Sequence, residues 1–274
     1  MLRCGRFTLS LDRPLIMGIV NVTPDSFSDG GKFYSAERAI AHALQLVEQG
    51  ADMLDIGGES TRPGAQSVGA DEESARILPV LEGLAQCGLP LSVDTLKPEV
   101  MRTVIQAGVD MINDVNALQS PGALQAVADS GVGVCLMHMQ GEPRTMQHDP
   151  RYQNVVAEVK TFLAARVAAA EQAGIARERM VIDPGFGFGK ALEHNLALLH
   201  GLDAFGSLGV PLLAGLSRKS MLGALTGLSV AERMLPSVVA AVISAMKGAK
   251  ILRVHDVKET KQALQIVSAV EEAG

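Results

Sequence analysis

The sequence predicts a single (β/α)8 barrel, an α/β fold in which eight parallel strands alternate with helices around a closed sheet. Short β-rich runs alternate with segments of helical periodicity, and the 274 residues suffice for one such barrel. An open, doubly wound sheet is the main alternative, because it shares the alternation of strands and helices. The eight strand candidates are residues 15–20, 53–56, 91–93, 111–112, 132–137, 180–182, 212–214 and 251–254.

The first thirteen residues precede the barrel. Residues 6–11 alternate in polarity ahead of the first β-rich run, so we expect residues 1–13 to form a short β-hairpin that plugs the bottom of the barrel. Residues 14–274 then form the barrel, and residues 1–274 form one domain. Between the strands, apolar residues recur at helical spacing, for example in residues 36–47 and 77–85.

Residues that favour helix ends stand between these segments. N-cap residues are expected at Ser35 and Asp71, and a capping box is expected at Asp256 with Glu259. Pro98 suits the first turn of a helix. The glycines expected just after helices are Gly50, Gly88 and Gly108.

Composition argues against several classes of protein. The net charge is -6, from 24 basic and 30 acidic residues without charge runs, so neither nucleic acid nor a membrane is an expected partner. No apolar run approaches the ~18–20 residues that cross a bilayer. Cys4, Cys87 and Cys135 are far apart and in no metal-binding spacing, which favours free thiols and a cytoplasmic protein.

Polar side chains stand at the carboxyl end of almost every predicted strand, where a barrel of this type builds its active site. One Asn or Asp at such a position is usually a turn former, but eight convergent ends indicate a binding pocket. Acceptors and amides there suit a flat heterocycle with N–H and amino groups, and cations suit phosphates. The polar ends are Asn21, Asp55, Asp94, Asn113, His138, Asp183, Ser217 with Arg218 and Lys219, and Arg253 with His255.

Four of the seven phenylalanines, Phe27, Phe33, Phe186 and Phe188, fall in two predicted loops rich in glycine. We expect these rings to close over a planar ligand; the alternative is that they pack back on the barrel rim. Residues 185–190 match neither GxGxxG nor GxxxxGK[ST], and the sequence contains no HExxH and no Gly-x-Ser-x-Gly elbow. Nucleotide-loop and zinc sites are therefore not expected.

Two long motifs and six short ones follow one another in a familiar order. The long motifs are MGIVNVTPDSFSDGG at residues 17–31 and GADMLDIGGESTRP at residues 50–63. The short ones are SVD at 92–94, IND at 112–114, LMHM at 136–139, DPGFGF at 183–188, GLSRKS at 215–220 and RVH at 253–255. Together they span essentially the whole barrel and resemble the dihydropteroate synthases, within the wider pterin-binding barrel family.

The resemblance implies an activity in folate biosynthesis. The family condenses 6-hydroxymethyl-7,8-dihydropterin pyrophosphate with p-aminobenzoate to give 7,8-dihydropteroate and pyrophosphate, with Mg²⁺ as cofactor. Sulfonamides are implied as inhibitors in the p-aminobenzoate slot. The resemblance also implies a homodimer, and residues 231–247 carry more apolar surface than barrel packing needs.

The same resemblance assigns roles to individual residues. The pterin ring is expected to contact Asp94, Asn113, Met137, Asp183, Lys219 and Arg253. The pyrophosphate is expected to contact Asn21, Thr61, Arg62, Arg253 and His255, with Asn21 as the Mg²⁺ ligand. The p-aminobenzoate ring is expected to contact Phe27, Pro63, Phe188, Lys219 and Ser220. The residues implied in catalysis are Asp94, Lys219, Arg253, His255 and Asp29, the last holding the amine or escorting pyrophosphate.

Two alternatives stay open from the sequence alone. A related barrel binds methyltetrahydrofolate for methyl transfer to a corrinoid, but residues 61–63 and 217–220 favour the synthase. A non-catalytic pterin-binding paralogue would be expected to lose Asp94, Arg253 or His255, and all three are present.

Overall fold

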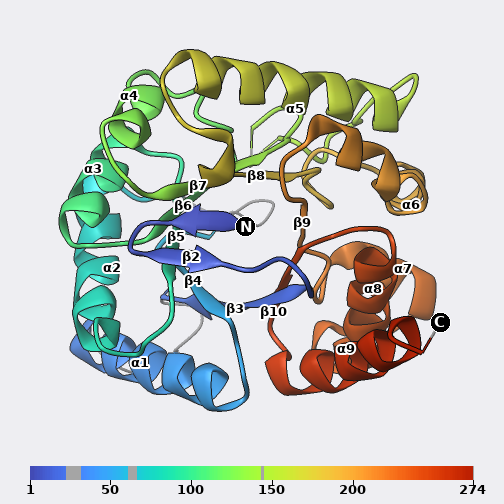
Figure 1. The fold of residues 1–274 in the computed structure, drawn as a ribbon, viewed down its shortest axis with the longest axis horizontal. Helices are drawn as coiled ribbons and strands as arrows, with labels where there is room; N and C mark the ends of the chain where they lie inside the picture. Colours follow the sequence, from blue (N-terminus) through green and yellow to red (C-terminus); the bar gives the residue numbers. More distant parts are fainter. Residues whose placement is uncertain (23–31, 61–66, 143–144, 274) are drawn as a thin grey trace.

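The computed structural model describes residues 1–22, 32–60, 67–142 and 145–273, and among them eight parallel strands form a barrel inside a ring of helices (Figure 1). The barrel strands are β3 (Leu15–Asn21), β4 (Met53–Gly57), β5 (Leu91–Asp94), β6 (Met111–Asp114), β7 (Gly133–Met137), β8 (Met180–Asp183), β9 (Leu213–Ala214) and β10 (Ile251–Val254). Their order is β8-β7-β6-β5-β4-β3-β10-β9, and a bridge between Ile182 and Leu212 closes the ring. The predicted barrel is confirmed, and the open sheet is wrong.

The helices follow the strands in alternation and cover the outside of the sheet (Figure 1). They are α1 (Lys32–Glu48), α2 (Ala70–Leu84), α3 (Pro98–Gln106), α4 (Ala123–Ala128), α5 (Val155–Gln172), α6 (Leu192–His200), α7 (Ser220–Thr226), α8 (Met234–Met246) and α9 (Val257–Glu271). Short 3-10 helices are η2 (Arg177–Arg179), η3 (Leu202–Leu208) and η4 (Val230–Glu232). None of these described helices combines the length and the apolar character needed to cross a bilayer.

Two apolar layers hold the barrel together, because successive side chains of a strand point to opposite faces of the sheet. In β4, Leu54 packs outward against the helices, whereas Met53 belongs to a separate cluster inside the barrel. The strands are therefore buried on both faces and are apolar almost throughout, as parallel strands usually are.

The N-terminal hairpin closes one end of the barrel (Figure 1). Its strands, β1 (Leu2–Cys4) and β2 (Phe7–Leu9), pair antiparallel, as predicted for this segment. Leu2 and Cys4 are fully buried in the interior cluster, and the Cys4 thiol lies 3.4 Å from the carbonyl oxygen of Asp110. The interior is thus filled at this end, and the polar strand ends lie at the opposite one.

Several helix ends differ from the prediction. Helix α1 begins at Lys32, so Ser35 lies within it, and α2 has Gly69 as its N-cap, so Asp71 lies in its first turn. Both N-cap predictions are wrong. An acidic residue in the first turn still stabilises a helix through its dipole, which explains why Asp71 resembled a start signal.

The last predicted cap is also wrong, although its position is right. Asp256 is the N-cap residue of α9, but its carboxylate binds the guanidinium of Arg218 at 2.5 Å instead of a backbone N–H. Pro98 is the first residue of α3, as predicted. The expected glycines have left-handed backbones, with φ of 94° at Gly50, 77° at Gly88 and 89° at Gly108.

Candidate active site

The centre of the site is an arginine between two buried carboxylates at the carboxyl ends of three strands. Arg253, on β10, donates from Nε to Oδ2 of Asp55 at 2.6 Å and from Nη2 to Oδ2 of Asp94 at 3.1 Å. Asn113, on β6, donates from Nδ2 to the same oxygen of Asp55 at 3.0 Å. These contacts fix four side chains in one layer at the mouth of the barrel.

Two oxygens of this layer are left for a ligand. Among the described residues, Oδ1 of Asp55 and Oδ1 of Asp94 are buried and have no hydrogen-bond partner. A buried acceptor without a partner is costly, and a bound molecule with N–H groups would supply one. The layer is therefore built to receive hydrogen-bond donors.

Burial and neighbouring charges tune the acidity of this layer. Burial raises the pKa of Asp94 to about 7, and Asp55 adds to the rise while Arg253 opposes it. Burial lowers the pKa of Arg253, but the carboxylates of Asp55 and Asp94 raise it overall, so the guanidinium stays charged. Asp94 thus changes charge close to neutral pH, beside a permanent cation.

Asp183 stands at the end of β8, on another side of the same pocket. Its Oδ1 accepts the N–H of Gly185 at 2.7 Å, and burial raises its pKa while Lys219 opposes the rise. A Cβ placed on Gly215 would lie 3.9 Å from Asp183 Oδ2 and 3.7 Å from Cβ of Arg253. Only a glycine separates Asp183 from Arg253, so both line one surface.

Lys219 precedes α7 and points across the pocket. Its Nζ donates to the carbonyl oxygen of Phe186 and lies 4.7 Å from the centroid of the Phe188 ring. Burial lowers the pKa of Lys219 to about 8, while Asp183 raises it. This ammonium therefore joins the loop after β8 to the loop after β9.

The backbone of Arg218 aims Lys219 in this direction. Arg218 has a φ of 59°, which is uncommon for a residue other than glycine, and its N–H donates to Oγ of Ser237 on α8 at 2.8 Å. Its guanidinium pairs with Asp256. Arg218 thus shapes the loop, and Lys219 is the cation that faces Asp183.

The two phenylalanines after β8 behave differently from each other. Phe186 is fully buried in the outer core, so the prediction that it closes over a ligand is wrong and packing back on the barrel is right. Gly185 and Gly187 have left-handed backbones, with φ of 70° and 79°, which turn the chain so that the ring faces inward. Phe188 is half-buried beside Lys219 and remains available to a ligand.

Asn21 and His255 lie at the ends of β3 and β10, and both are half-buried. Nδ1 of His255 lies 2.9 Å from Oγ of Ser217. A Cβ on Gly57 would lie 3.9 Å from Oδ1 of Asn21 and 3.8 Å from Cβ of Asp94, so Asn21 borders the pocket that Asp94 lines. The described residues contain no group of three His, Cys, Asp or Glu that holds a metal.

His138 was expected at the mouth with the other polar ends, and it has a different environment. Its ring packs edge-on against Phe162 of α5, and its Nδ1 lies 2.9 Å from Nζ of Lys190. Burial, with Lys190 adding to the effect, lowers the pKa of His138 to about 3. His138 is a neutral packing residue near the site.

The remaining predicted residues divide into two groups. Met137 is buried at the end of β7, and Ser220 is exposed as the first residue of α7. The others, Phe27, Asp29, Thr61, Arg62 and Pro63, lie outside the described residues.

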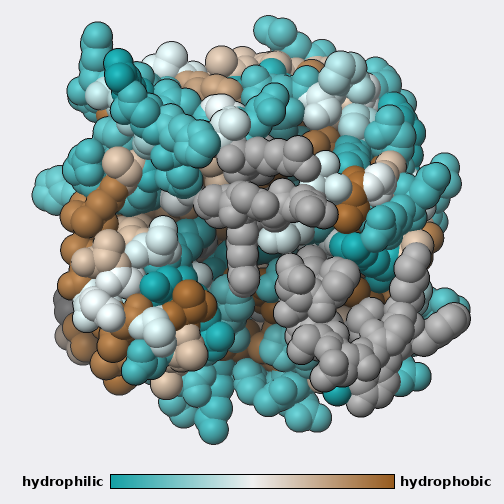
Figure 2. All heavy atoms as spheres, turned by 180° about the vertical axis from the view of Figure 1, so that it is seen from behind, coloured by the Kyte–Doolittle hydropathy of each residue, from teal (hydrophilic) through white to brown (hydrophobic). Residues whose placement is uncertain are grey.

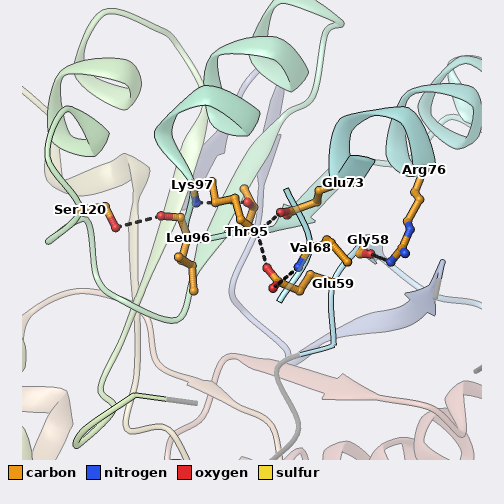
Figure 3. Close-up of polar contacts among 9 residues, drawn as sticks. All are labelled: Gly58, Glu59, Val68, Glu73, Arg76, Thr95, Leu96, Lys97 and Ser120. Atoms are coloured by element: carbon orange, nitrogen blue, oxygen red, sulfur yellow. Dashed lines mark hydrogen bonds and ion pairs between the residues drawn. The ribbon is translucent and has the colours of Figure 1, made fainter. Parts of the chain in front are cut away.

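Sequence reasoning missed two features of the site. Asp55 was placed among the acceptors of the pocket, but its bond to Arg253 was not predicted, although a carboxylate inside a buried β-run is a usable signal. The second feature is a cluster of Glu59, Glu73 and Lys97 next to the ends of β4 and β5 (Figure 3). No sequence pattern announces it, because its members come from three separate segments.

The fold and this site define a class of protein, the pterin-binding barrel enzymes. The sequence model of the family described as "Pterin binding enzyme" matches residues 17–255, which is most of the chain.

Known proteins narrow the class. Dihydropteroate synthase of Escherichia coli strain K12 is 52% identical over 263 residues, which cover 96% of this chain and 93% of that protein. The structure of Xanthomonas albilineans dihydropteroate synthase with 4-aminobenzoic acid is 57% identical, with a TM-score of 0.91 and coverage of 96% and 95%. The Yersinia pestis enzyme in complex with a sulfonamide drug is 49% identical, with a TM-score of 0.94 and coverage of 99% of both chains. The chain belongs to the dihydropteroate synthases of the pterin-binding family.

Proposed function

We propose that the chain condenses 6-hydroxymethyl-7,8-dihydropterin pyrophosphate with p-aminobenzoate, which gives 7,8-dihydropteroate and pyrophosphate. The observation that carries this proposal is the layer in which Arg253 joins Asp55 and Asp94 and two carboxylate oxygens are buried without a partner among the described residues. Family membership supports the same reaction.

The pterin ring takes its hydrogen bonds from the strand ends. An ionised Asp183 offers two oxygens in one plane, which complement the 2-amino group and the adjacent ring N–H. Asp94 accepts a second N–H through its unpartnered Oδ1, and Asn113 supplies an amide. Met137 and Arg253 contact the two faces of the ring, and Lys219 donates to a ring acceptor.

The leaving pyrophosphate is held on the other side of the mouth. Arg253 and His255 supply cationic or N–H donors there, and Thr61 and Arg62 add to them. The C–O bond of the pterin methylene breaks first, its electron pair leaves with pyrophosphate, and the electron-rich dihydropterin stabilises the cation. The arylamine then forms the C–N bond and releases a proton. Because an aromatic amine is already a neutral nucleophile, no dedicated base is needed.

Asn21 fits a magnesium ion of this reaction. Mg²⁺ prefers oxygen ligands and commonly keeps waters and substrate phosphates, so one carboxamide oxygen at the pocket edge is a suitable protein contribution. When bound, the ion supplies positive charge to the phosphate oxygens. Asn21 would hold it beside Asp94, whose own Oδ2 is occupied by Arg253.

The p-aminobenzoate slot lies between the loops after β8 and β9. The half-buried Phe188 ring and the Lys219 stem would pack on the arene, with Phe27 and Pro63 completing the slot. Backbone N–H groups at Ser220 would receive the carboxylate. Asp29 is assigned to holding the amine or escorting pyrophosphate. A sulfonamide would fit the same slot, as the complex of the Yersinia pestis enzyme suggests.

We also propose a cytoplasmic homodimer in which residues 1–274 form one domain. Exposed apolar side chains gather on one flank, over α8 and its surroundings, and Figure 2 shows them at the left of the molecule. Leu235, Val239 and Met246 are 68%, 50% and 68% exposed, an unusual apolar face for a helix that meets water. Cys4, Cys87 and Cys135 are all described and form no disulfide, which suits a reducing compartment.

The test of the reaction is pyrophosphate release by the purified protein, given the dihydropterin pyrophosphate and Mg²⁺, with p-aminobenzoate present or withheld. Release that needs both substrates supports the synthase. Pterin binding without release would contradict it, and methyltetrahydrofolate would then be tested as the ligand of a methyltransferase.

A further inference from the structure

Three charged side chains next to the ends of β4 and β5 join three segments of the chain (Figure 3). Nζ of Lys97 contacts Oε2 of Glu59 and lies 2.5 Å from Oε2 of Glu73. Their side chains are 18%, 13% and 0% exposed, respectively. Glu59 follows β4, Glu73 lies in the first turn of α2, and Lys97 is the N-cap residue of α3.

The charges of this cluster do not balance. Burial lowers the pKa of Lys97, but its hydrogen bonds to Glu59 and Glu73 raise it overall, so the side chain is an ammonium. One ammonium faces two carboxylates, and Oε1 of Glu73 is buried without a partner among the described residues. Among the described residues, Lys97 is thus the counter-charge of the cluster. Its removal would leave the buried Glu73 and the half-buried Glu59 together without that cation.

A short connection with fixed ends links the cluster to the pocket. Lys97 follows Asp94 by three residues, and hydrogen bonds hold the residues between them. The Thr95 N–H donates to the Asn113 carbonyl at 3.1 Å, and the Lys97 N–H donates to Oγ1 of Thr95 at 3.3 Å. These two bonds connect the backbone of Lys97 to the end of β5.

Glu59 adds the end of β4 to the same assembly. Its Oε1 accepts the N–H of Val68 at 3.1 Å, while its Oε2 contacts Lys97. The neighbouring Gly58 carbonyl accepts a bond from Nη1 of Arg76 on α2 at 2.8 Å. The ends of β4 and β5 are thus tied to α2 through one ammonium and one guanidinium.

We propose that Lys97 is a positioning residue of the pterin pocket, which ties the ends of β4 and β5 and offsets Glu59 and Glu73, so that Asp94 remains an ionised carboxylate that accepts strong hydrogen bonds. This inference rests on the proposed role of Asp94. Burial is the main cause of the raised pKa of Asp94, and the charge of Glu73 adds to it. The charged groups that interact electrostatically with Asp94 are Asp55, Glu73, Asp114 and Arg253. Lys219 and the Cys135 thiol also interact with it. Lys97 interacts with Glu59 and Glu73.

The test is calorimetric binding of 6-hydroxymethylpterin from about pH 5.5 to about pH 8.5. For Lys97→Met, the fall in affinity on the acid side should move up by roughly one pH unit, or close to tenfold in affinity near pH 6.5, because two carboxylates lose their counter-charge. For Glu73→Gln, the fall in affinity should move to lower pH. The double variant should return toward wild type, and Lys258→Met, the same change at an exposed lysine on α9, should have no effect.

The outcomes separate electrostatic positioning from simple structural support. The proposal is overturned if Lys97→Met folds and its affinity falls at the same acidic pH as that of the wild type. It is also overturned if the double variant binds the pterin as weakly as Lys97→Met does. If Lys97→Met does not fold, Glu73→Gln still tests the proposal. A fall in affinity at the wild-type pH, or at a higher pH, would contradict it. If the affinity of Asp94→Asn falls on the acid side as that of the wild type does, the assigned role of Asp94 is wrong, and this inference is wrong with it.

Discussion

The acidity of Asp94 predicts how pterin binding depends on pH. The pKa of Asp94 is raised to about 7 by burial, and the ionised carboxylate accepts the ring N–H more strongly than the neutral acid does. The ionised fraction is then roughly nine tenths at about pH 8 and roughly one tenth at about pH 6, so affinity for 6-hydroxymethylpterin should fall about tenfold between them. The contribution of Asp94 is present above its pKa and is lost as the pH falls through it.

The variant Asp94→Asn separates this effect from other titrating groups, including Asp183 and Lys219. At about pH 8 its affinity should be lower by about 1.5–3 kcal/mol, the usual value of a hydrogen bond to a charged group. Its affinity should then change less than that of the wild type between the two pH values. Isothermal titration calorimetry measures both quantities, and Asp203→Asn, at an exposed position in η3, is the matched control. Equal slopes for wild type and Asp94→Asn would refute the reasoning.

Three further predictions concern the buried contact of Asp55 with Arg253, the loop after β8 and the proposed dimer. Asp55→Asn weakens the buried contact with Arg253, so urea denaturation should show a loss of about 2–4 kcal/mol; a loss below ~0.5 kcal/mol would contradict this. Gly185→Ala places a Cβ 1.9 Å from the carbonyl oxygen of His138 at a φ of 70°, so thermal unfolding should reveal a loss of at least ~2 kcal/mol, and an unchanged Tm would count against it. Leu235→Glu puts a charge on the exposed face of α8 and should yield monomers in sedimentation velocity, whereas an unaltered dimer would place the interface elsewhere.

Much of the fold was predictable because strands of a parallel barrel are buried on both faces and form apolar runs. The run at residues 251–254, for example, coincides with β10. The first residues of the helices were harder to predict, because the N-cap position depends on how the chain leaves the preceding strand. Ser35 and Asp71 had suitable side chains, but the helices begin before them.

The site was predictable to the extent that strand ends converge. Asp94 is the last residue of β5 and pairs with Asn113 near the end of the neighbouring β6, so the two had to lie together. The bond between Asp55 and Arg253 joins residues 198 positions apart, and its formation depends on side-chain reach across the barrel mouth. The burial of Phe186 depends on the backbone angles of two glycines, which residue type alone leaves open.

The junction between β8 and β9 is the most weakly paired part of the described barrel, so it should be the first to open locally. β9 has two residues, fewer than any other described strand, and meets β8 through a single bridge. Local opening requires the least free energy where the fewest hydrogen bonds must break. The loop with Lys219 follows directly from β9, so the proposed p-aminobenzoate slot borders the junction that we expect to open most easily. Asp55, Asp94 and Asn113 stand on β4, β5 and β6, which are paired along their lengths. The proposed pocket thus joins a continuously paired part of the ring to its most weakly paired junction, where Asp183 ends β8.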